Sequence, residues 1–468
     1  MRRRAQRGAG MSVPTVAPAA PSTAAAPPPR RTPAVHDTLP RPARTPRPSL
    51  RPRLRGAPAR IRATTALVIL LLAALFAALT VGVAKARGNV HAVGRSAAPQ
   101  AATASDLYFA LADIDAQVAN VLLIGHDEQI GNKQSALRQL RLRRASVNTD
   151  VQALIDRGLG TADAGTAGEL LAGLARYDAL AAQAQAADDQ VQDRPVGRPP
   201  ALAVNYYLAA TALMHQDLLP AADRLGRGAE DRLSAAASDG SSTAKLTSAA
   251  VWAVGGATLL TLLVWQFTLA RRFRRILNPG LAAATVAVAV LTVLGGSLLS
   301  DQGTRVRDAK STSFDPFSAL ARTRAVASDA NADESRYLML PEREGYYRAQ
   351  FAAKSTALDP TSTSPGLTAR LAAFRRDDSA LQAAVASGRR DVAIGMATNV
   401  GRGNLAFEFY DYQSTLDTEA DAHRAAFDTE IADTEDALDG WTWLPGVVLG
   451  VGVVLVVFGI RPRLREYA

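Results

Sequence analysis

The stretch LARRFRRILNPGLAA, residues 269–283, decides how this chain folds. Four arginines fall within five of its positions: Arg271, Arg272, Arg274 and Arg275. An Asn-Pro-Gly turn follows them, and long segments without any charge lie on both sides. Short arginine-rich loops between apolar segments stay on the cytoplasmic side of a membrane. We therefore interpret residues 271–280 as the cytoplasmic end of a transmembrane hairpin.

Four segments lack Asp, Glu, Lys and Arg over at least 21 residues each: Ala63–Ala84, Leu246–Ala270, Ile276–Ser300 and Gly440–Ile460. A bilayer core about 30 Å thick is crossed by roughly 20 helical residues. All four tryptophans lie in these segments, as expected of side chains that favour the membrane interface. We predict transmembrane helices at 63–84, 247–270, 281–300 and 441–460. The alternative, long core helices of a soluble protein, seldom stays uncharged for so long.

The charges on the remaining segments predict the topology. Residues 1–62 carry 14 Arg and one Asp, and the tail 461–468 carries three Arg and one Glu. Positive segments stay inside, so both termini are expected in the cytoplasm of a multi-pass cell-membrane protein. The inner segments together carry a charge of +19. Because the whole chain has a net charge of +10, the outer domains carry −9.

The leader 1–62 is rich in Pro, Ala, Thr and Arg, so we expect it to be disordered. Its basic charge suits anionic membrane lipid, while nucleic acid is disfavoured as a partner of a chain tethered by four spans. A cleaved signal peptide is the alternative for the first span. That span is longer than the roughly 7–15 apolar residues of a signal core.

Residues 85–246 and 301–440 are predicted to be extracytoplasmic helical domains resembling four-helix bundles. One predicted helix carries apolar side chains every three or four positions: Leu107, Leu111, Ile114, Val118 and Val121. In the second domain we expect helices near 315–340, 342–358, 366–398 and 404–440. The last has no Gly or Pro from Asn404 to Asp439, so it should enter the membrane as a rod with irregularities only at Gly440 and Pro445.

The repeated order of span, outer domain and span indicates an internal duplication. DIDAQVANVLLIG from Asp113 aligns with DANADESRYLMLP from Asp329, and Gly125 then meets Pro341. The fold class is therefore an all-α membrane protein, with four transmembrane helices and two duplicated outer bundles.

Few residues suggest chemistry. The chain has no Cys and none of the nucleotide-binding, HExxH, GxSxG or kinase motifs, so we expect no enzyme and no cofactor. His126, Asp127 and Glu128 could bind a metal, but a solvated loop is the simpler interpretation. We likewise expect no catalytic or metal-binding residue elsewhere.

Aromatic residues mark one hairpin tip in YLMLPEREGYY, residues 337–347. Tyr337, Tyr346 and Tyr347 could form a docking surface for an extracytoplasmic partner, or simply pack the hairpin corner. Within the spans, the pairs Gly255-Gly256 and Gly295-Gly296 permit close helix contact. No ionisable residue lies inside a span, which argues against a transporter.

The four-span plan, together with ALARTRAVASDANADESRYLML at 319–340, resembles the GlnX family of actinobacterial membrane sensors. The resemblance implies a sensor that relays extracytoplasmic amino-acid availability to the cytoplasm. Its implied partners are an extracytoplasmic amino-acid-binding lipoprotein, GlnH, and a cytoplasmic Ser/Thr protein kinase, protein kinase G. On this view the arginines of 271–280 contact the cytoplasmic partner. A membrane scaffold that senses nothing is the alternative.

Overall fold

A computed structural model describes residues 57–125, 133–159, 161–273, 279–361 and 363–465. Within these ranges every regular element is a helix and none is a strand. Residues 55–468 form one compact unit, distinct from the residues before them. The leader predicted to be disordered lies outside the described residues, except for the few that begin the first helix.

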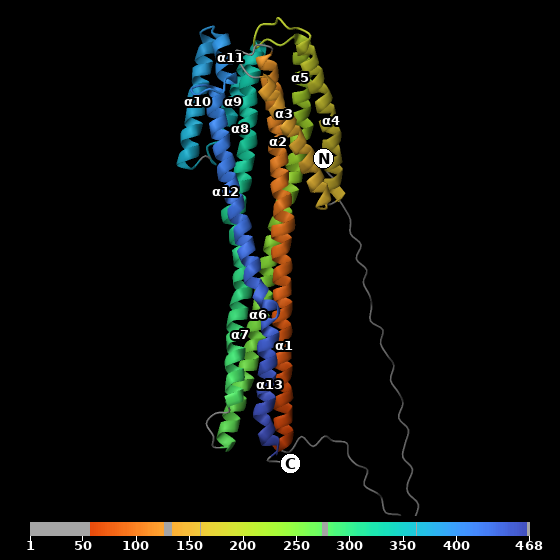
Figure 1. The fold of residues 1–468 in the computed structure, drawn as a ribbon, viewed down its shortest axis with the longest axis vertical. Helices are drawn as coiled ribbons and strands as arrows, with labels where there is room; N and C mark the ends of the chain where they lie inside the picture. The colour runs from red at the N-terminus through yellow and green to blue at the C-terminus, as the bar shows by residue number, and fades with distance from the viewer. Residues whose placement is uncertain (1–56, 126–132, 160, 274–278, 362, 466–468) are drawn as a thin grey trace, which may run out of the picture. The chain divides into compact units, whose positions relative to one another are not determined.

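Four long helical rods make up most of this unit (Figure 1). The first consists of α1 (Ala57–His91), η1 (Ala92–Ala97) and α2 (Ala98–Ile124). The second consists of α5 (Ala201–Leu213), η2 (Met214–Leu218) and α6 (Leu219–Phe273). The third consists of α7 (Pro279–Ala309), η3 (Lys310–Phe314) and α8 (Asp315–Met339). The fourth consists of α12 (Leu405–Asp439), η5 (Gly440–Thr442) and α13 (Leu444–Arg465). The elements η1, η2 and η3 are π-helical turns, and η5 is a 3₁₀ turn at the predicted irregularity.

Shorter helices complete the head, the part of the unit away from the apolar rod ends. They are α3 (Lys133–Asp156), α4 (Thr161–Asp189), η4 (Pro341–Arg343), α9 (Glu344–Ala357), α10 (Pro365–Ala386) and α11 (Arg390–Thr398). The single helix predicted over 366–398 is wrong, because α10 and α11 are separate. Gly388 has φ 76°, a left-handed conformation that ends a helix and favours glycine.

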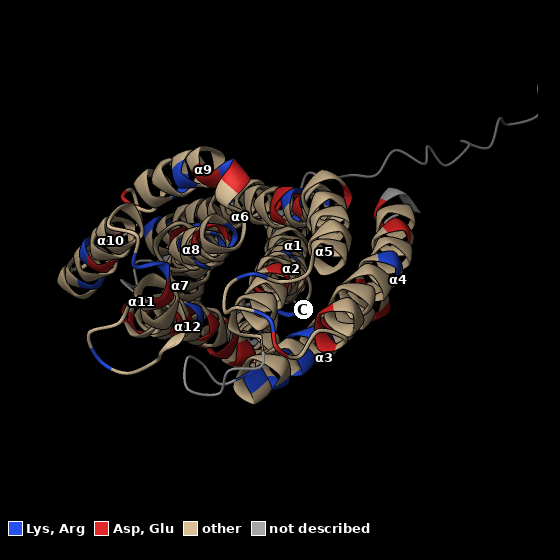
Figure 2. Ribbon diagram, turned by 90° about the horizontal axis from the view of Figure 1, so that it is seen from above, with Lys and Arg blue, Asp and Glu red and all other residues tan. Residues whose placement is uncertain are grey.

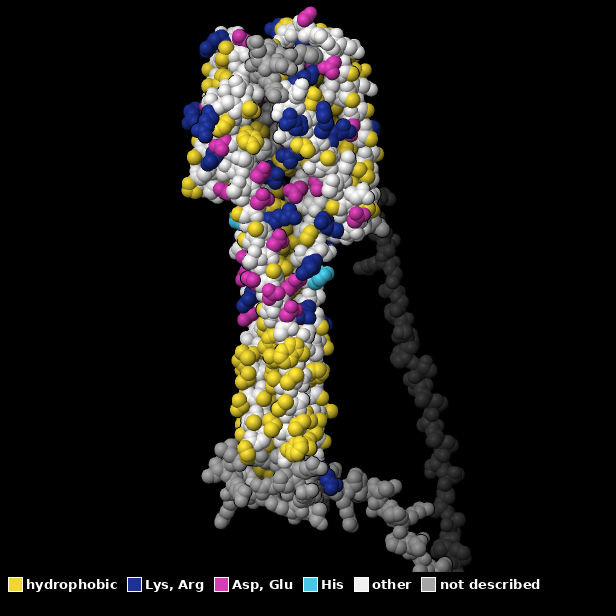
Figure 3. Space-filling view, in the orientation of Figure 1, with side chains coloured by type: hydrophobic (Ala, Val, Ile, Leu, Met, Phe, Trp, Pro, Cys, Tyr) yellow, Lys and Arg dark blue, Asp and Glu magenta, His cyan; other side chains and the backbone are white. Residues whose placement is uncertain are grey.

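Each rod contains a window long and apolar enough to cross a membrane, so the chain is a multi-pass membrane protein. Large apolar side chains are exposed on all four rods there; among them are Leu70, Phe76, Leu260, Phe267, Val286, Val293, Val451 and Phe458. Figure 3 shows an apolar band on one face of the molecule, below a charged region. Exposed side chains of this kind suit contact with lipid tails.

Glycine brings the membrane helices into contact, as predicted from the sequence. A Cβ on Gly255 would lie 2.3 Å from Thr292, and one on Gly296 would lie 2.6 Å from Trp252, so α6 and α7 touch there. Gly256 has open space instead. Polar contacts join the same pair of helices: Gln266 Nε2 donates to Thr285 Oγ1 at 2.7 Å, and Ser248 Oγ donates to the Gly296 carbonyl at 2.9 Å.

The two predicted bundles share one core, because α2 and α8 pack along each other at the centre of the head (Figure 2). Helices α3 and α4, with the second rod, surround α2. Helices α9 and α12 pack against α8, and α10 and α11 pack against α12. As a result, both central helices are buried along most of their length.

The rods confirm the internal duplication. In each half a long helix passes through one π turn, η1 or η3, into the central helix of its bundle. Under the alignment of Asp113 with Asp329, η1 corresponds to residues 308–313 and overlaps η3. Helix α2 ends at Ile124, which aligns with Leu340. Helix α8 ends one residue earlier, at Met339. The fold class inferred from the sequence is confirmed.

Candidate functional site: a buried charge network and an adjacent pocket

Arg336 of α8 is the centre of the candidate site, and only 2% of its surface is exposed. One guanidinium nitrogen forms an ion pair with Asp115 of α2. The other terminal nitrogen lies 2.6 Å from Asp333 Oδ1 and 3.3 Å from Asp329 Oδ1. Nε donates a hydrogen bond to Tyr207 Oη at 2.9 Å. Each guanidinium nitrogen thus has a partner, as a buried charge requires.

Asp115 joins this arginine to the first half of the chain. Tyr177 Oη donates to Asp115 Oδ1 at 3.0 Å, and Thr211 Oγ1 donates to Oδ2 at 2.6 Å. Burial by itself raises the pKa of Asp115, but the Arg336 charge, His215 and Thr211 together lower it to about 2. The carboxyl group therefore remains ionised at neutral pH.

Lys354 of α9 supplies the second positive charge. Its Nζ lies 2.6 Å from Asp329 Oδ2 and 2.5 Å from Asp333 Oδ2. His215 Nε2 lies 3.4 Å from Asp329 Oδ1. Three carboxylates and one histidine thus face two permanent cations. We call the following residues the charge network: Asp115, Tyr177, Tyr207, Thr211, His215, Asp329, Asp333, Arg336 and Lys354.

The sequence of α8 brings its part of the charge network together. Asp329, Asp333 and Arg336 recur at spacings of four and three, so they lie along one face of the helix. Sequence analysis used this segment only for the duplication and the resemblance, and it missed the network. The sequence feature that could have revealed the network was a stripe of charged residues at the spacing expected of a core face. Its partners on α2 and the second rod lie more than a hundred residues away along the chain.

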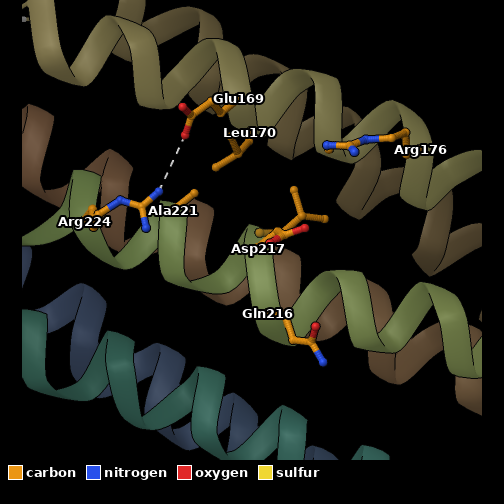
Figure 4. A pocket seen from close by; sticks show the side chains of 9 residues that line it. Glu169, Leu170, Arg176, Gln216, Asp217, Ala221 and Arg224 are labelled. Atoms are coloured by element: carbon orange, nitrogen blue, oxygen red, sulfur yellow. Dashed lines mark ion pairs between the residues drawn. The ribbon is translucent and has the colours of Figure 1, made fainter.

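A pocket of about 250 Å³ lies between α4 and the start of α6 (Figure 4). We call it the α4–α6 pocket; it is lined by Glu169, Leu170, Gly173, Arg176, Gln216, Asp217, Leu218, Ala221 and Arg224. Glu169 and Arg224 approach to 3.7 Å at one end. Among the described residues, Arg176 and Asp217 have no ion-pair partner, although they carry opposite charges on the two sides of the pocket.

The π turn η2 belongs to both features. His215 faces the charge network, while Gln216 and Asp217 line the pocket. Met214 and Leu218, at the two ends of the turn, are buried in the core. Single π turns inside α-helices occur often at functional sites. A change at the pocket therefore has a short structural path to the buried charges.

A second acidic cluster lies on α8, where Glu334 is buried and neither carboxyl oxygen has a hydrogen-bond donor. Its neighbour is the Asp378 carboxyl group of α10, which accepts a hydrogen bond from Gln382 at 2.8 Å. Burial, together with the negative charges of Asp378 and Asp333, raises the pKa of Glu334 well above its ordinary value. Burial raises the pKa of Asp378 to about 6. Two adjacent buried carboxyl groups are most stable when they hold a proton between them.

The loop arginines lie at the edge of what the structure describes. Arg271 is exposed at the end of α6, with its guanidinium 4.4 Å from the centre of the Phe267 ring. Arg272 lies in α6, but its side chain is not among those described, and Arg274 and Arg275 lie outside the described residues. Their proposed cytoplasmic role stays a prediction.

Of the three hairpin tyrosines, Tyr346 alone is exposed. Tyr337 and Tyr347 are buried, and the Tyr346 ring packs edge-on against Tyr347 at 5.1 Å between centroids. This arrangement fits a packed corner, the second interpretation that the sequence left open. The possible metal ligands at residues 126–128 lie outside the described residues, and no cluster of metal-binding side chains occurs within the described ranges.

Residues 89–238 match the family model of the actinobacterial sensor domain. This segment begins near the end of α1 and ends within α6, and it holds the α4–α6 pocket and the first-half residues of the charge network. No curated protein and no solved structure matches the chain. The match supports a sensor family of actinobacteria, and with it a sensing role.

Proposed function

We propose that this chain is a transmembrane sensor that relays extracytoplasmic amino-acid availability to a cytoplasmic Ser/Thr protein kinase. The observation that carries the proposal is the continuity of the rods. A continuous helical stretch from Arg62 to Ile124 joins the first span to the centre of the matched sensor domain. Its 63 residues correspond to about 95 Å at 1.5 Å per residue. A rod of this kind transmits a shift of the head into the membrane.

Charge distribution supports the direction of the relay. The arginine-rich loop 271–280 and the basic termini favour the cytoplasmic side, which leaves the head outside. In this topology the head meets an amino-acid-binding lipoprotein, and the loop meets the kinase. The chain itself needs no catalytic activity, because the kinase supplies the output.

The charge network offers a physical basis for two states. It holds α2, the second rod, α8 and α9 through charges that must all stay paired. A small displacement of one helix would leave a buried charge without its partner, so intermediate positions are unfavourable. A docked lipoprotein would shift the balance between two packings only by its difference in affinity for them.

The test uses the full chain in phospholipid nanodiscs. Crosslinking in native membranes identifies the lipoprotein and the kinase, and each is then captured with and without L-glutamate or L-glutamine. We expect the amino acid to change capture of both partners. Association that ignores the amino acid would instead support a scaffold that senses nothing.

A variant of the loop tests the inner contact. Replacing the four loop arginines with Gln should weaken kinase capture without changing lipoprotein capture, because the two sites lie on opposite sides of the membrane. Cysteine labelling from each side verifies that the variant keeps its topology. Unchanged kinase capture in a correctly oriented variant would exclude the loop as the kinase contact.

A further inference from the structure

We infer that the α4–α6 pocket itself binds a small zwitterion, a molecule with one carboxylate and one ammonium group such as a free α-amino acid. The inference deepens the proposed sensing role by placing a ligand site on this chain, in addition to any site on a partner. It rests on that role for its consequence, while the binding can be measured separately.

The charges of the pocket define the ligand class. Glu169 and Arg224 form an exposed ion pair at 3.7 Å at one end of the pocket. Arg176 and Asp217 line the same pocket as a cation and an anion that have no ion-pair partner among the described residues. A simple anion would satisfy only the arginine, and a simple cation only the aspartate. A zwitterion satisfies both through charge-assisted hydrogen bonds.

Size and lining agree with this class. The volume of about 250 Å³ equals that of roughly eight liquid water molecules, which suits a small organic molecule. Leu170 and Leu218 are buried beneath the charged rim, so a ligand would meet chiefly polar and charged side chains. The floor is also tightly packed, because a Cβ on Gly173 would lie 2.8 Å from Leu218. The two helices are thus held at a fixed separation.

The position of Asp217 gives binding a consequence. It lies two residues from His215 within the same π turn. His215 Nε2 in turn lies 3.8 Å from Asp115 Oδ2 and 3.4 Å from Asp329 Oδ1. A ligand that holds Asp217 toward α4 would bias the turn, and with it the only histidine of the charge network. The pocket in the first half is thereby coupled to α8 in the second.

The binding test is calorimetric titration of the full chain in nanodiscs. The probes are L-alanine and L-glutamine, and the matched half-ligands are propionate and ethylamine. We expect at least one amino acid to bind at least about tenfold more tightly than either half-ligand, since each half-ligand loses one charge-assisted contact. Equal affinity for propionate would make the pocket a simple anion site and overturn the inference.

Variants place the binding in this pocket. Arg176→Gln and Asp217→Asn should each weaken binding of that amino acid at least about tenfold. Both side chains are exposed, so the fold should be unaffected. Arg227→Gln is the matched control, because Arg227 is an exposed arginine of α6 that pairs with Asp223 at 2.6 Å and does not line the pocket. Equal loss in the control, or no loss in both pocket variants, would overturn the inference.

Failure of the inference and failure of the proposed function give different results. If amino acids do not bind the chain but still change capture of the lipoprotein and the kinase, only the direct site is excluded. If amino acids bind and the pocket variants abolish binding, but capture of the lipoprotein and the kinase never changes, the binding site is supported and the relay function is contradicted.

Discussion

Helices α2 and α8 hold equivalent positions in the two halves of the molecule, yet their buried side chains differ in chemistry. The alignment that pairs Asp113 with Asp329 also pairs Val118 with Glu334. Val118 is one of many apolar side chains buried along α2. At the equivalent place in α8 the chain buries a carboxylic acid, and Arg336 follows two residues later. Helix α2 buries mostly apolar side chains with two aspartates, Asp113 and Asp115, whereas α8 buries more charged groups.

The comparison teaches that duplicated helices can keep one position in the fold while their roles diverge. Apolar contacts tolerate small shifts because they are not directional. Buried charges tolerate few such shifts, because each charge needs its partner at hydrogen-bonding distance. We therefore regard the more charged α8, with Asp115 of α2 as the partner of its arginine, as the element that specifies how the halves fit together. The predictions below test this difference, from the largest expected effect to the smallest.

Removing the central cation should have the largest effect. Arg336→Met leaves Asp115 and Asp333 buried beside an apolar group, so the free energy of unfolding should fall by about 3–5 kcal/mol. Thermal unfolding of the full chain in nanodiscs, followed by circular dichroism, measures the loss. Arg138→Gln on the exposed face of α3 is the control and should change little. Adding Asp115→Asn to Arg336→Met should recover part of the loss, and a purely additive double variant would contradict the coupling.

The two acidic clusters of the head should respond to pH with opposite signs. The folded pKa of Asp378 is raised to about 6, so the folded state binds more protons than the unfolded state between about pH 4 and 6. The stability that protonated Asp378 contributes is present below that window. It is lost as the pH rises through the window, by at most roughly 3 kcal/mol. The pKa of Asp115 is lowered to about 2, so the stability that this ionised group contributes is instead lost as the pH falls toward 2.

Unfolding measured at a series of pH values checks this prediction, with Asp378→Asn as the variant. Gln382 and Arg348 also face Asp378, and both remain in the variant. The variant should flatten the decline on the alkaline side and leave the acid side unchanged. If the free energy of unfolding still declines with rising pH in the variant, a group other than Asp378 causes the decline.

Making α8 resemble α2 should stabilise the head. Glu334→Val removes a buried acid whose hydrogen-bond neighbour is another carboxyl group, that of Asp378, so the free energy of unfolding at neutral pH should rise by about 1–3 kcal/mol. The mirror variant Val118→Glu should destabilise the head instead, because it buries an acid at the apolar position. Stability is again measured in nanodiscs. If Glu334→Val is less stable than the parent chain, the acid has a stabilising partner and α8 is not under this strain.

The smallest effect is expected at a neutral contact between the two helices. Ser335 Oγ donates a hydrogen bond to Asn120 Oδ1 at 2.6 Å. Ser335→Ala should lower the free energy of unfolding by about 1 kcal/mol, the usual contribution of one such bond. A double-mutant cycle with Asn120→Ala measures the coupling. A cost as large as that of Arg336→Met would show that the neutral contact matters as much as the charges.

The membrane helices and the duplication could be predicted because their signals are local. The uncharged runs coincide with the apolar windows of the rods, and Gly255, Gly295 and Gly296 lie at helix contacts. A bilayer imposes one length and one polarity on any segment that crosses it, so neighbours along the chain suffice. The break of the second bundle at Gly388 was missed, because one glycine inside a helical pattern is often tolerated.

The charge network could not be predicted in the same way. Asp115, Tyr207 and Arg336 lie on three helices and meet only after the halves pack. A stripe of Asp, Asp and Arg along a helix is ordinarily a solvated face, and it is buried here because α2, the second rod and α9 pack against it. Residues that share a face of one helix are fixed by the helix period, and that period is encoded locally. Which charges become partners depends on long-range packing, so tertiary structure alone placed Arg336 among its carboxylates.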